Sequence, residues 1–285
     1  MTTEFDAFGP WIDEVRTTGD LPRLYRDAGV DPAVHRLVLK VPRDIERRNA
    51  DPAMHLYDYL LALDEEYLTV LHRRGDTYDT SRVPLDRVAA IEDSVRLLNG
   101  RLVIHTVDGA ATEVAYNGSA NAPIRKLITA IRKWYLPETP PADDVPAPPL
   151  PRLGRADTGL LTDWRHLMRQ EPGLRLFTVA EQLTVTPSRG WERLYRKVWP
   201  LTLHASISVT DDREIQVLHR RDWFTPGGDE LSLARTVLPR DRITEITVRD
   251  HLRYEGVHVL TVRSGATVLE FPMAAGPATE ALRTT

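Results

Sequence analysis

Apolar and polar residues alternate with the two-residue period of half-buried β-strands through much of the first half of the chain. Asn99-Gly100 and Asp108-Gly109 interrupt this alternation, and such dipeptides are strong hairpin signals. The pattern predicts an antiparallel meander. The alternating runs cover 35–42, 67–74, 100–107 and 112–117.

A helical period replaces the strand period after residue 120. Asn121 can cap a helix and Pro123 fits the first helical turn. The sequence therefore predicts an amphipathic helix that closes the first half. Its apolar stripe consists of Ile124, Leu127, Ile128, Ile131 and Trp134.

The second half of the chain repeats the first. The pentapeptide VLHRR occurs at 70–74 and again at 217–221, inside longer segments that align at a constant offset of 147 residues. Downstream, 84–116 aligns with 239–271 at an offset of 155. Trp11 aligns with Trp164 upstream. Aligned blocks in the same order indicate a duplicated domain, and we expect a tryptophan-bearing helix ahead of each sheet.

A proline-rich segment separates the two copies. It has no strand or helical period, which is typical of an extended, semi-rigid linker. The predicted organisation is a first repeat with an N-terminal helix at 1–135, a linker at 136–156, and a second repeat with a leading helix at 157–285.

Two corresponding stretches carry a family resemblance. VPLDRVAAIEDSVRLLNGRLVIHTVDG at 83–109 and LPRDRITEITVRDHLRYEGVHVLTVRSG at 238–265 resemble the pattern of bacterial pleckstrin-homology (PH) domains. The resemblance implies an α+β protein of two tandem PH-like domains, each a bent antiparallel sheet or barrel closed by a C-terminal helix. The second closing helix would be short, and the apolar surface it leaves would need another cover, such as a second copy of the chain.

Composition narrows the function classes. The 285 residues include no cysteine, which excludes disulfides and thiolate metal sites. A net charge of -4 argues against nucleic-acid binding. The acidic N-terminus lacks the pattern of an export signal, and no apolar stretch is long enough to span a membrane. We expect a cytoplasmic protein.

Catalytic motifs are missing from the sequence. It contains no HExxH, GxSxG, Walker lysine loop or GxGxxG. We therefore expect no enzyme activity, no cofactor and no metal. One alternative is a small-ligand sensor or enzyme that uses the matching histidines of the two copies, with their neighbouring arginines: His72, Arg74, His219 and Arg221.

Basic segments follow the first strand-like run of each half. The PH resemblance places a headgroup-binding loop there, and arginine grips phosphate through two hydrogen bonds while tryptophan and tyrosine favour interfaces. Three readings stay open: a solvated surface, a protein-partner surface, or an anionic membrane surface. The predicted function is a non-enzymatic interaction or scaffold protein with an unknown protein partner or a homodimer contact, and the alternative is peripheral lipid binding. The candidate residues are Arg43, Arg47, Arg48, Arg189, Trp191, Arg193, Tyr195, Arg196, Lys197 and Trp199.

Overall fold

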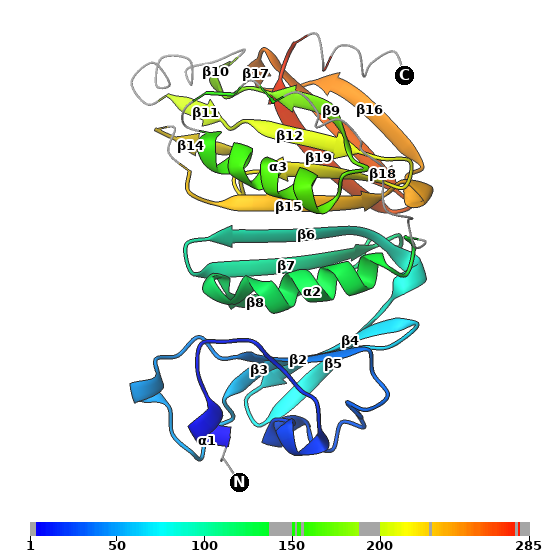
Figure 1. The fold of residues 1–285 in the computed structure, drawn as a ribbon. Helices are drawn as coiled ribbons and strands as arrows, with labels where there is room; N and C mark the ends of the chain where they lie inside the picture. The colour runs from blue at the N-terminus through cyan, green and yellow to red at the C-terminus, as the bar shows by residue number, and fades with distance from the viewer. Residues whose placement is uncertain are drawn as a thin grey trace. The chain divides into compact units, whose positions relative to one another are not determined.

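The computed structural model has mostly antiparallel strands and few helices, which confirms the α+β class (Figure 1). It describes residues 4–136, 150–151, 153–154, 157–187, 200–227, 230–276 and 279. The chain forms two compact units. Unit 1 contains 4–88, 97–106 and 111–136, and unit 2 contains 89–96, 107–110 and the described residues from 150 onward.

Unit 1 contains a five-stranded antiparallel sheet whose strands lie in chain order. Each strand pairs with the next, so the sheet is built from local connections. Gly75, with φ of 67°, makes the turn between the last two strands in a conformation that glycine adopts easily. The strands are β1 (Asp13–Glu14), β2 (Leu37–Pro42), β3 (Tyr57–Leu63), β4 (Tyr67–Arg74) and β5 (Thr77–Pro84).

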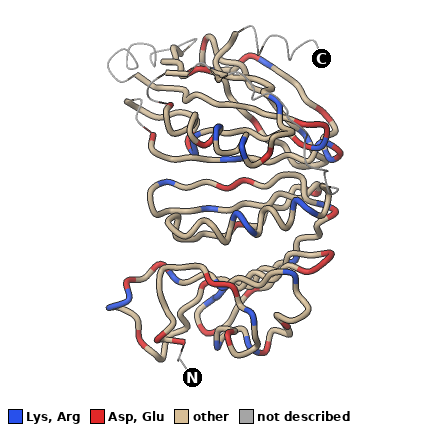
Figure 2. The backbone as a smooth tube through the Cα atoms, in the orientation of Figure 1, with Lys and Arg blue, Asp and Glu red and all other residues tan. Residues whose placement is uncertain are grey.

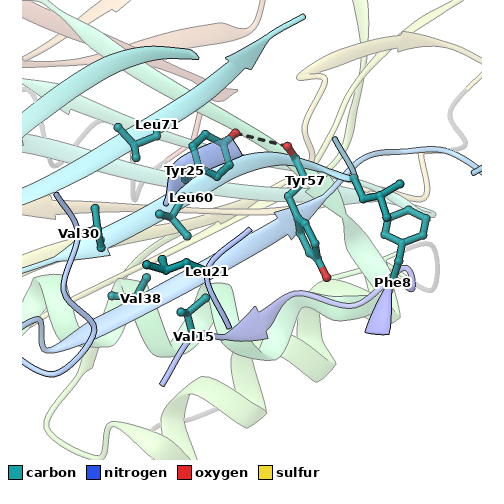
Figure 3. Close-up of a cluster of buried hydrophobic side chains, with 11 residues drawn as sticks. Phe8, Val15, Leu21, Tyr25, Val30, Val38, Tyr57, Leu60 and Leu71 are labelled. Atoms are coloured by element: carbon teal, nitrogen blue, oxygen red, sulfur yellow. Dashed lines mark hydrogen bonds between the residues drawn. The ribbon is translucent and has the colours of Figure 1, made fainter. Parts of the chain in front are cut away.

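The N-terminal segment supplies part of the core of unit 1 (Figure 3). Phe8, Val15 and Leu21 pack with side chains from β2, β3 and β4. Tyr25 is fully buried, and its hydroxyl donates to the Asp58 carbonyl at 2.9 Å and lies 3.4 Å from the Tyr57 carbonyl. Burial raises the pKa of Tyr25, so the hydroxyl stays a donor.

The prediction of a helix that carries Trp11 is wrong. The nearby α-helix in the described residues is α1 (Glu4–Ala7), which ends before Gly9-Pro10; β1 follows, and then two short 3-10 helices, η1 (Thr18–Asp20) and η2 (Arg23–Tyr25). Proline cannot donate the backbone hydrogen bond that a continuing helix needs. Trp11 is therefore 57% exposed.

Unit 1 also contains the paired strands β7 (Asn99–Thr106) and β8 (Ala111–Asn117), followed by α2 (Asn121–Arg132). Four of the five predicted stripe residues are buried, but the helix ends before Trp134, which is 38% exposed. Asn117 rather than Asn121 acts as a cap: its side chain accepts from the Ser119 amide in the turn before α2.

Asn99-Gly100 does not form the predicted turn. The turn falls on Leu97 and Leu98, with Leu97 at a φ of 54°, and Asn99 and Gly100 already belong to β7. Gly100 has a packing role instead, because a Cβ there would lie 2.4 Å from the ring of Tyr116 on β8.

The larger sheet of unit 2 includes a strand from the first half of the sequence. β6 (Val88–Arg96) pairs with β15 (Leu233–Pro239) from Ile91 to Val95, and the order continues from β15 to β13, β12 and β9. The helix α3 (Thr158–Gln170) packs on β12 and β13 through Leu160 and Trp164, as predicted for the second copy. The other strands are β9 (Arg175–Ala180), β12 (Ser206–Thr210) and β13 (Glu214–His219).

Two smaller sheets complete unit 2. A three-stranded sheet has the order β16-β18-β19, and its apolar residues form a core with side chains from β13 and β15. A four-stranded sheet has the order β14-β11-β10-β17. The strands are β10 (Leu183–Pro187), β11 (Leu201–Leu203), β14 (Phe224–Pro226), β16 (Glu245–Asp250), β17 (Tyr254–Glu255), β18 (Val257–Ser264) and β19 (Thr267–Ala274).

Both copies place corresponding strands in the same order. The pairings β2-β3-β4-β5 recur as β9-β12-β13-β15. The first set is followed by β6, β7 and β8, and the second by β16, β18 and β19 with the two-residue β17 between β16 and β18. Within the described residues every sheet is open, so the predicted barrel is wrong. β6 lies in unit 2 and pairs with β15. Most of the linker, and the second closing helix apart from Thr279, lie outside the described residues.

Candidate interaction site

The first basic segment is largely occupied by contacts within unit 1. Arg47 donates to the carbonyls of Phe8 and Asp6 and lies over the ring of Phe5. Arg43 donates to the His55 carbonyl at 3.2 Å, and Arg48 forms an exposed ion pair with Glu46. Arg47 and Arg43 therefore connect this segment to neighbouring parts of unit 1, and their role in binding stays a prediction. Figure 2 shows acidic and basic residues interspersed along both units.

Replacing Arg47 tests its role as a clamp. In Arg47→Ala the carbonyls of Phe8 and Asp6 lose a charged donor, and we expect the free energy of unfolding to fall by about 1 kcal/mol. Arg48→Ala is the matched control, and its expected change is within about 0.5 kcal/mol because its ion pair is exposed. Urea unfolding of the full chain measures both. Equal losses in the two variants would contradict the clamp.

The second basic segment lies outside the described residues. It contains the predicted binding residues Arg189, Trp191, Arg193, Tyr195, Arg196, Lys197 and Trp199. The described strands on either side, β10 and β11, pair with each other between Val185 and Leu201. The lipid-binding prediction therefore stays a prediction for this segment.

The two matching histidines lie in different surroundings. His219 is fully buried, stacks on Trp223 with ring centres 4.5 Å apart, and lies 2.9 Å from the Thr236 hydroxyl. Burial lowers its pKa to about 4, so it is neutral near pH 7. His72 is half-buried and stacks on Tyr59 at 4.3 Å, and partial burial lowers its pKa. Each ring packs on an aromatic neighbour, which is the arrangement of a structural histidine.

The arginines beside these histidines also have structural partners. Arg74 forms an exposed ion pair with Asp79 at 2.8 Å. Arg221 donates to both the hydroxyl and the carbonyl of Ser94 on β6, at 3.0 and 2.9 Å, and its amide donates to the Ser232 hydroxyl. Arg221 thus fastens β6 to the rest of unit 2.

A hollow of about 290 Å³ lies where β16, β17 and β18 meet. Tyr254 forms one wall: its ring stacks on His251 at 4.8 Å and packs against Phe224 at 5.2 Å. Gly256, with φ of 68°, turns the chain from β17 into β18. The lining residues are Asp250, His251, Tyr254, Glu255, Gly256, Val257 and His258.

The ionisable side chains that line the hollow are two carboxylates, two imidazoles and the phenol of Tyr254. His258 is buried, and its imidazole lies 3.2 Å from the Thr279 hydroxyl and 3.4 Å from the Asp250 carboxylate. Burial, with help from the charges of Arg249 and Arg253, lowers the pKa of His251. Two carboxylates and an aromatic wall suit a cationic side chain, which they can bind through ion pairing and apolar contact with its aliphatic part.

An exposed leucine stands beside the hollow. Leu252, in the turn between β16 and β17, is 85% exposed. A partner bound at the hollow would also contact this exposed apolar side chain. Sequence reasoning missed this site because its residues look like the ordinary polar turn of a hairpin. The available signal was the run HLRY, which joins a leucine to three potential partner-binding side chains.

Comparisons with known proteins do not assign the chain. No family model matches it, and searches of curated proteins and of solved structures find no significant match. In the described part of the chain, no helix is long and apolar enough to span a membrane. The same residues contain no group of three or more histidines and carboxylates arranged to hold a metal ion.

Proposed function

We propose that the chain is a non-enzymatic interaction protein made of two PH-like domains, and that the hollow of unit 2 receives a basic side chain of a protein partner. The PH-like part rests on the repeated order of four antiparallel strands followed by three more, and on α2 after the first set. The observation that carries the binding function is the exposed Leu252 beside a hollow lined by Tyr254, Asp250 and Glu255.

The division of roles follows from the chemistry of the site. Leu252 contributes apolar contact, which stabilises binding when water is excluded. The Glu255 and Asp250 carboxylates select a positive charge. The Tyr254 ring already has the Arg253 guanidinium 5.9 Å from its centre, so it contributes apolar contact to the aliphatic part of a lysine or arginine side chain. The expected partner is a segment with a basic residue next to an apolar one.

Peptide display on the full chain tests this proposal. We expect selected peptides to be enriched in arginine or lysine next to an apolar residue. They should bind at least about ten-fold more weakly to Leu252→Asp and to Glu255→Gln, the loss typical of a central interface residue. Leu231→Asp is the matched control, because Leu231 is also in unit 2, is 74% exposed, and does not line the hollow.

Selected peptides without basic residues, or peptides that bind Glu255→Gln and Leu252→Asp as tightly as the wild type, would contradict the proposal. Circular dichroism of each variant shows whether its fold is intact.

A further inference from the structure

The pairing of β6 with β15 leaves two strand edges open. β15 pairs with β13 on one side and β6 on the other, whereas its counterpart in the first copy, β5, pairs only with β4 among the described strands. In the same way β6 pairs with β15, but its counterpart β16 has only β18 as a partner within the described residues. The duplicated chain therefore uses one member of each pair and leaves the other available.

The residues of the two paired strands are more buried than those of the two strands with an open edge. Most of β15 and of the paired part of β6 is buried or half-buried, while five of eight residues in β5 and five of six in β16 are exposed. An open strand edge presents unpaired backbone donors and acceptors and can pair with another chain. β5 is eight residues long, which is enough for a stable pairing.

The backbone amides that point outward from β5 lie at the positions that align with the residues of β15 facing β6. The Arg240 amide donates to the Arg213 carbonyl just before β13, so by alternation Arg235 and Val237 face β6. The Leu85 amide donates to Glu66 before β4, so Thr80 and Arg82 face the open edge of β5. These residues correspond to Arg235 and Val237 at the offset of 155.

The same alternation applies to β16. The His251 amide donates to the carbonyl of Val257, the first residue of β18, so Ile246 and Val248 face the open edge. They correspond to Ile91 and Asp93, which face β15. On both open edges, the residues whose backbone amides and carbonyls point outward are therefore the ones that align with the residues paired between β6 and β15.

We propose that β16 of one chain adds to β5 of a second copy of this protein, in the register of β6 and β15. Moving the observed pair Asp93 and Arg235 by the offset of 155 places Val248 opposite Thr80. The neighbouring pair, Ser94 and Ala234, becomes Arg249 opposite Asp79, so opposite charges face each other across the new contact.

The edges of β19 and β1 differ from the edges of β5 and β16. On β19 the Ala275 amide donates to Gly256 before β18, so Pro272 falls at an outward position, where it removes a donor from the edge. β1 is only two residues long. β16 contains no proline, and the only proline in β5 is its last residue.

The contact joins two different surfaces, so it is heterologous and links copies head to tail. Such contacts close into a ring when the geometry allows and otherwise extend. Because the contact uses β5 of one chain and β16 of another, it can form between a chain that has lost only β5 pairing and a chain that has lost only β16 pairing. Mixing two such variants therefore tests the contact. A change in β5 alone does not alter the residues that line the hollow.

Light scattering coupled to size-exclusion chromatography measures the assembly. We expect the wild type to have a mass that is a multiple of one chain, 32.3 kDa, and to dissociate on dilution. Thr80→Pro removes an outward donor from β5, and Val248→Pro removes one from β16, so each variant alone should have the mass of one chain. Val268→Pro on the outward side of β19 is the matched control and should stay assembled.

Mixing the two variants distinguishes the contact between β5 and β16 from any other contact. Thr80→Pro keeps an intact β16 and Val248→Pro keeps an intact β5, so an equimolar mixture should form a one-to-one dimer of two chains and nothing larger. A monomeric wild type, single variants that stay assembled, or a mixture that stays monomeric would each overturn the proposal. Unchanged circular dichroism and melting temperature show that each variant is folded. Peptide binding by Thr80→Pro then tests the hollow separately, since the two functions can fail independently.

Discussion

Lowering the pH from 7 to about 4 should reduce the free energy of unfolding of the wild-type protein by about 3 kcal/mol through His219 alone. Its folded pKa is about 4, below the ordinary value of 6.5, because the ring is fully buried. Between these pH values the unfolded chain binds the proton and the folded chain does not, so stability falls as the pH falls. The contribution is complete above pH 6.5 and lost below about pH 4.

The neighbours of His219 explain why no charge offsets this penalty. The ring stacks on Trp223, has Phe271 at its edge, and lies beside the Thr236 hydroxyl. Its other nitrogen lies 2.6 Å from the Arg220 carbonyl. None of these groups carries a charge. The hydrogen bond to the Arg220 carbonyl raises the pKa of His219, but burial lowers it by more.

The matched variants are His219→Gln and His72→Gln, which change the same position of the two copies. We expect His219→Gln to flatten the dependence of stability on pH between about 4 and 6.5 by most of the 3 kcal/mol. His72→Gln should flatten it much less, because His72 is only half-buried. Urea titrations at several pH values, followed by tryptophan fluorescence, measure both. Equal pH dependence in the wild type and His219→Gln would refute the assignment.

Arg220→Ala should destabilise the protein by about 3 kcal/mol, because it leaves the carboxylate of Asp157 buried without its counter-charge. The two side chains are 7% and 2% exposed, and the guanidinium lies 3.9 Å from the carboxylate. The same guanidinium donates to the Ser232 carbonyl at 2.8 Å. Asp157 precedes α3, so the loss should also loosen the start of that helix.

The pH dependence of this variant identifies the cause. Burial raises the pKa of Asp157, and the charge of Arg220 opposes that rise. A carboxyl with a raised folded pKa binds its proton more readily when folded, so stability falls as the pH rises past the unfolded pKa. Without Arg220 this fall should steepen, so Arg220→Ala should lose most stability at neutral pH and least in acid.

Two further variants separate the ion pair from general damage. Arg220→Ala combined with Asp157→Asn should recover part of the loss at neutral pH, because no buried charge remains. Arg175→Ala removes one partner of an exposed pair with Asp212 and should change stability by no more than about 0.5 kcal/mol. A loss in Arg220→Ala that is independent of pH and is not relieved by Asp157→Asn would rule out the charge explanation.

Local sequence signals predicted the local elements. The alternation at 67–74 and the stripe of Ile124, Leu127 and Ile131 correspond to β4 and α2, because strand and helix periods depend on which face is buried. The repeat anticipated the matching strand order. The prediction of a turn at Asn99-Gly100 was wrong because this glycine makes room for the Tyr116 ring on the next strand. A dipeptide does not show which side chain packs against it from a neighbouring strand.

Contacts between distant residues could not be predicted in the same way. Nothing in IEDSV indicates that it pairs with a strand near residue 235, since any alternating strand would fit. The arginines at 43 and 47 looked available for ligands because their partners are mainly backbone carbonyls, which every residue carries. The hollow near Tyr254 depends on an edge-to-face contact between Phe224 and His251, which are well separated in the sequence.

The place of β6 in unit 2 has a consequence for how the protein is made. During synthesis this strand leaves the ribosome well over a hundred residues before β15, so it must wait for its partner with an edge that other nascent chains can occupy. Pairing over such a sequence separation also makes folding slow, because a long loop must close first. The charged residues Glu92 and Asp93 in the middle of β6 would repel a second copy of the same strand during that interval. The early half of the chain thus depends on the late half to complete its fold, and a protein cut at the linker would separate β6 from its partner.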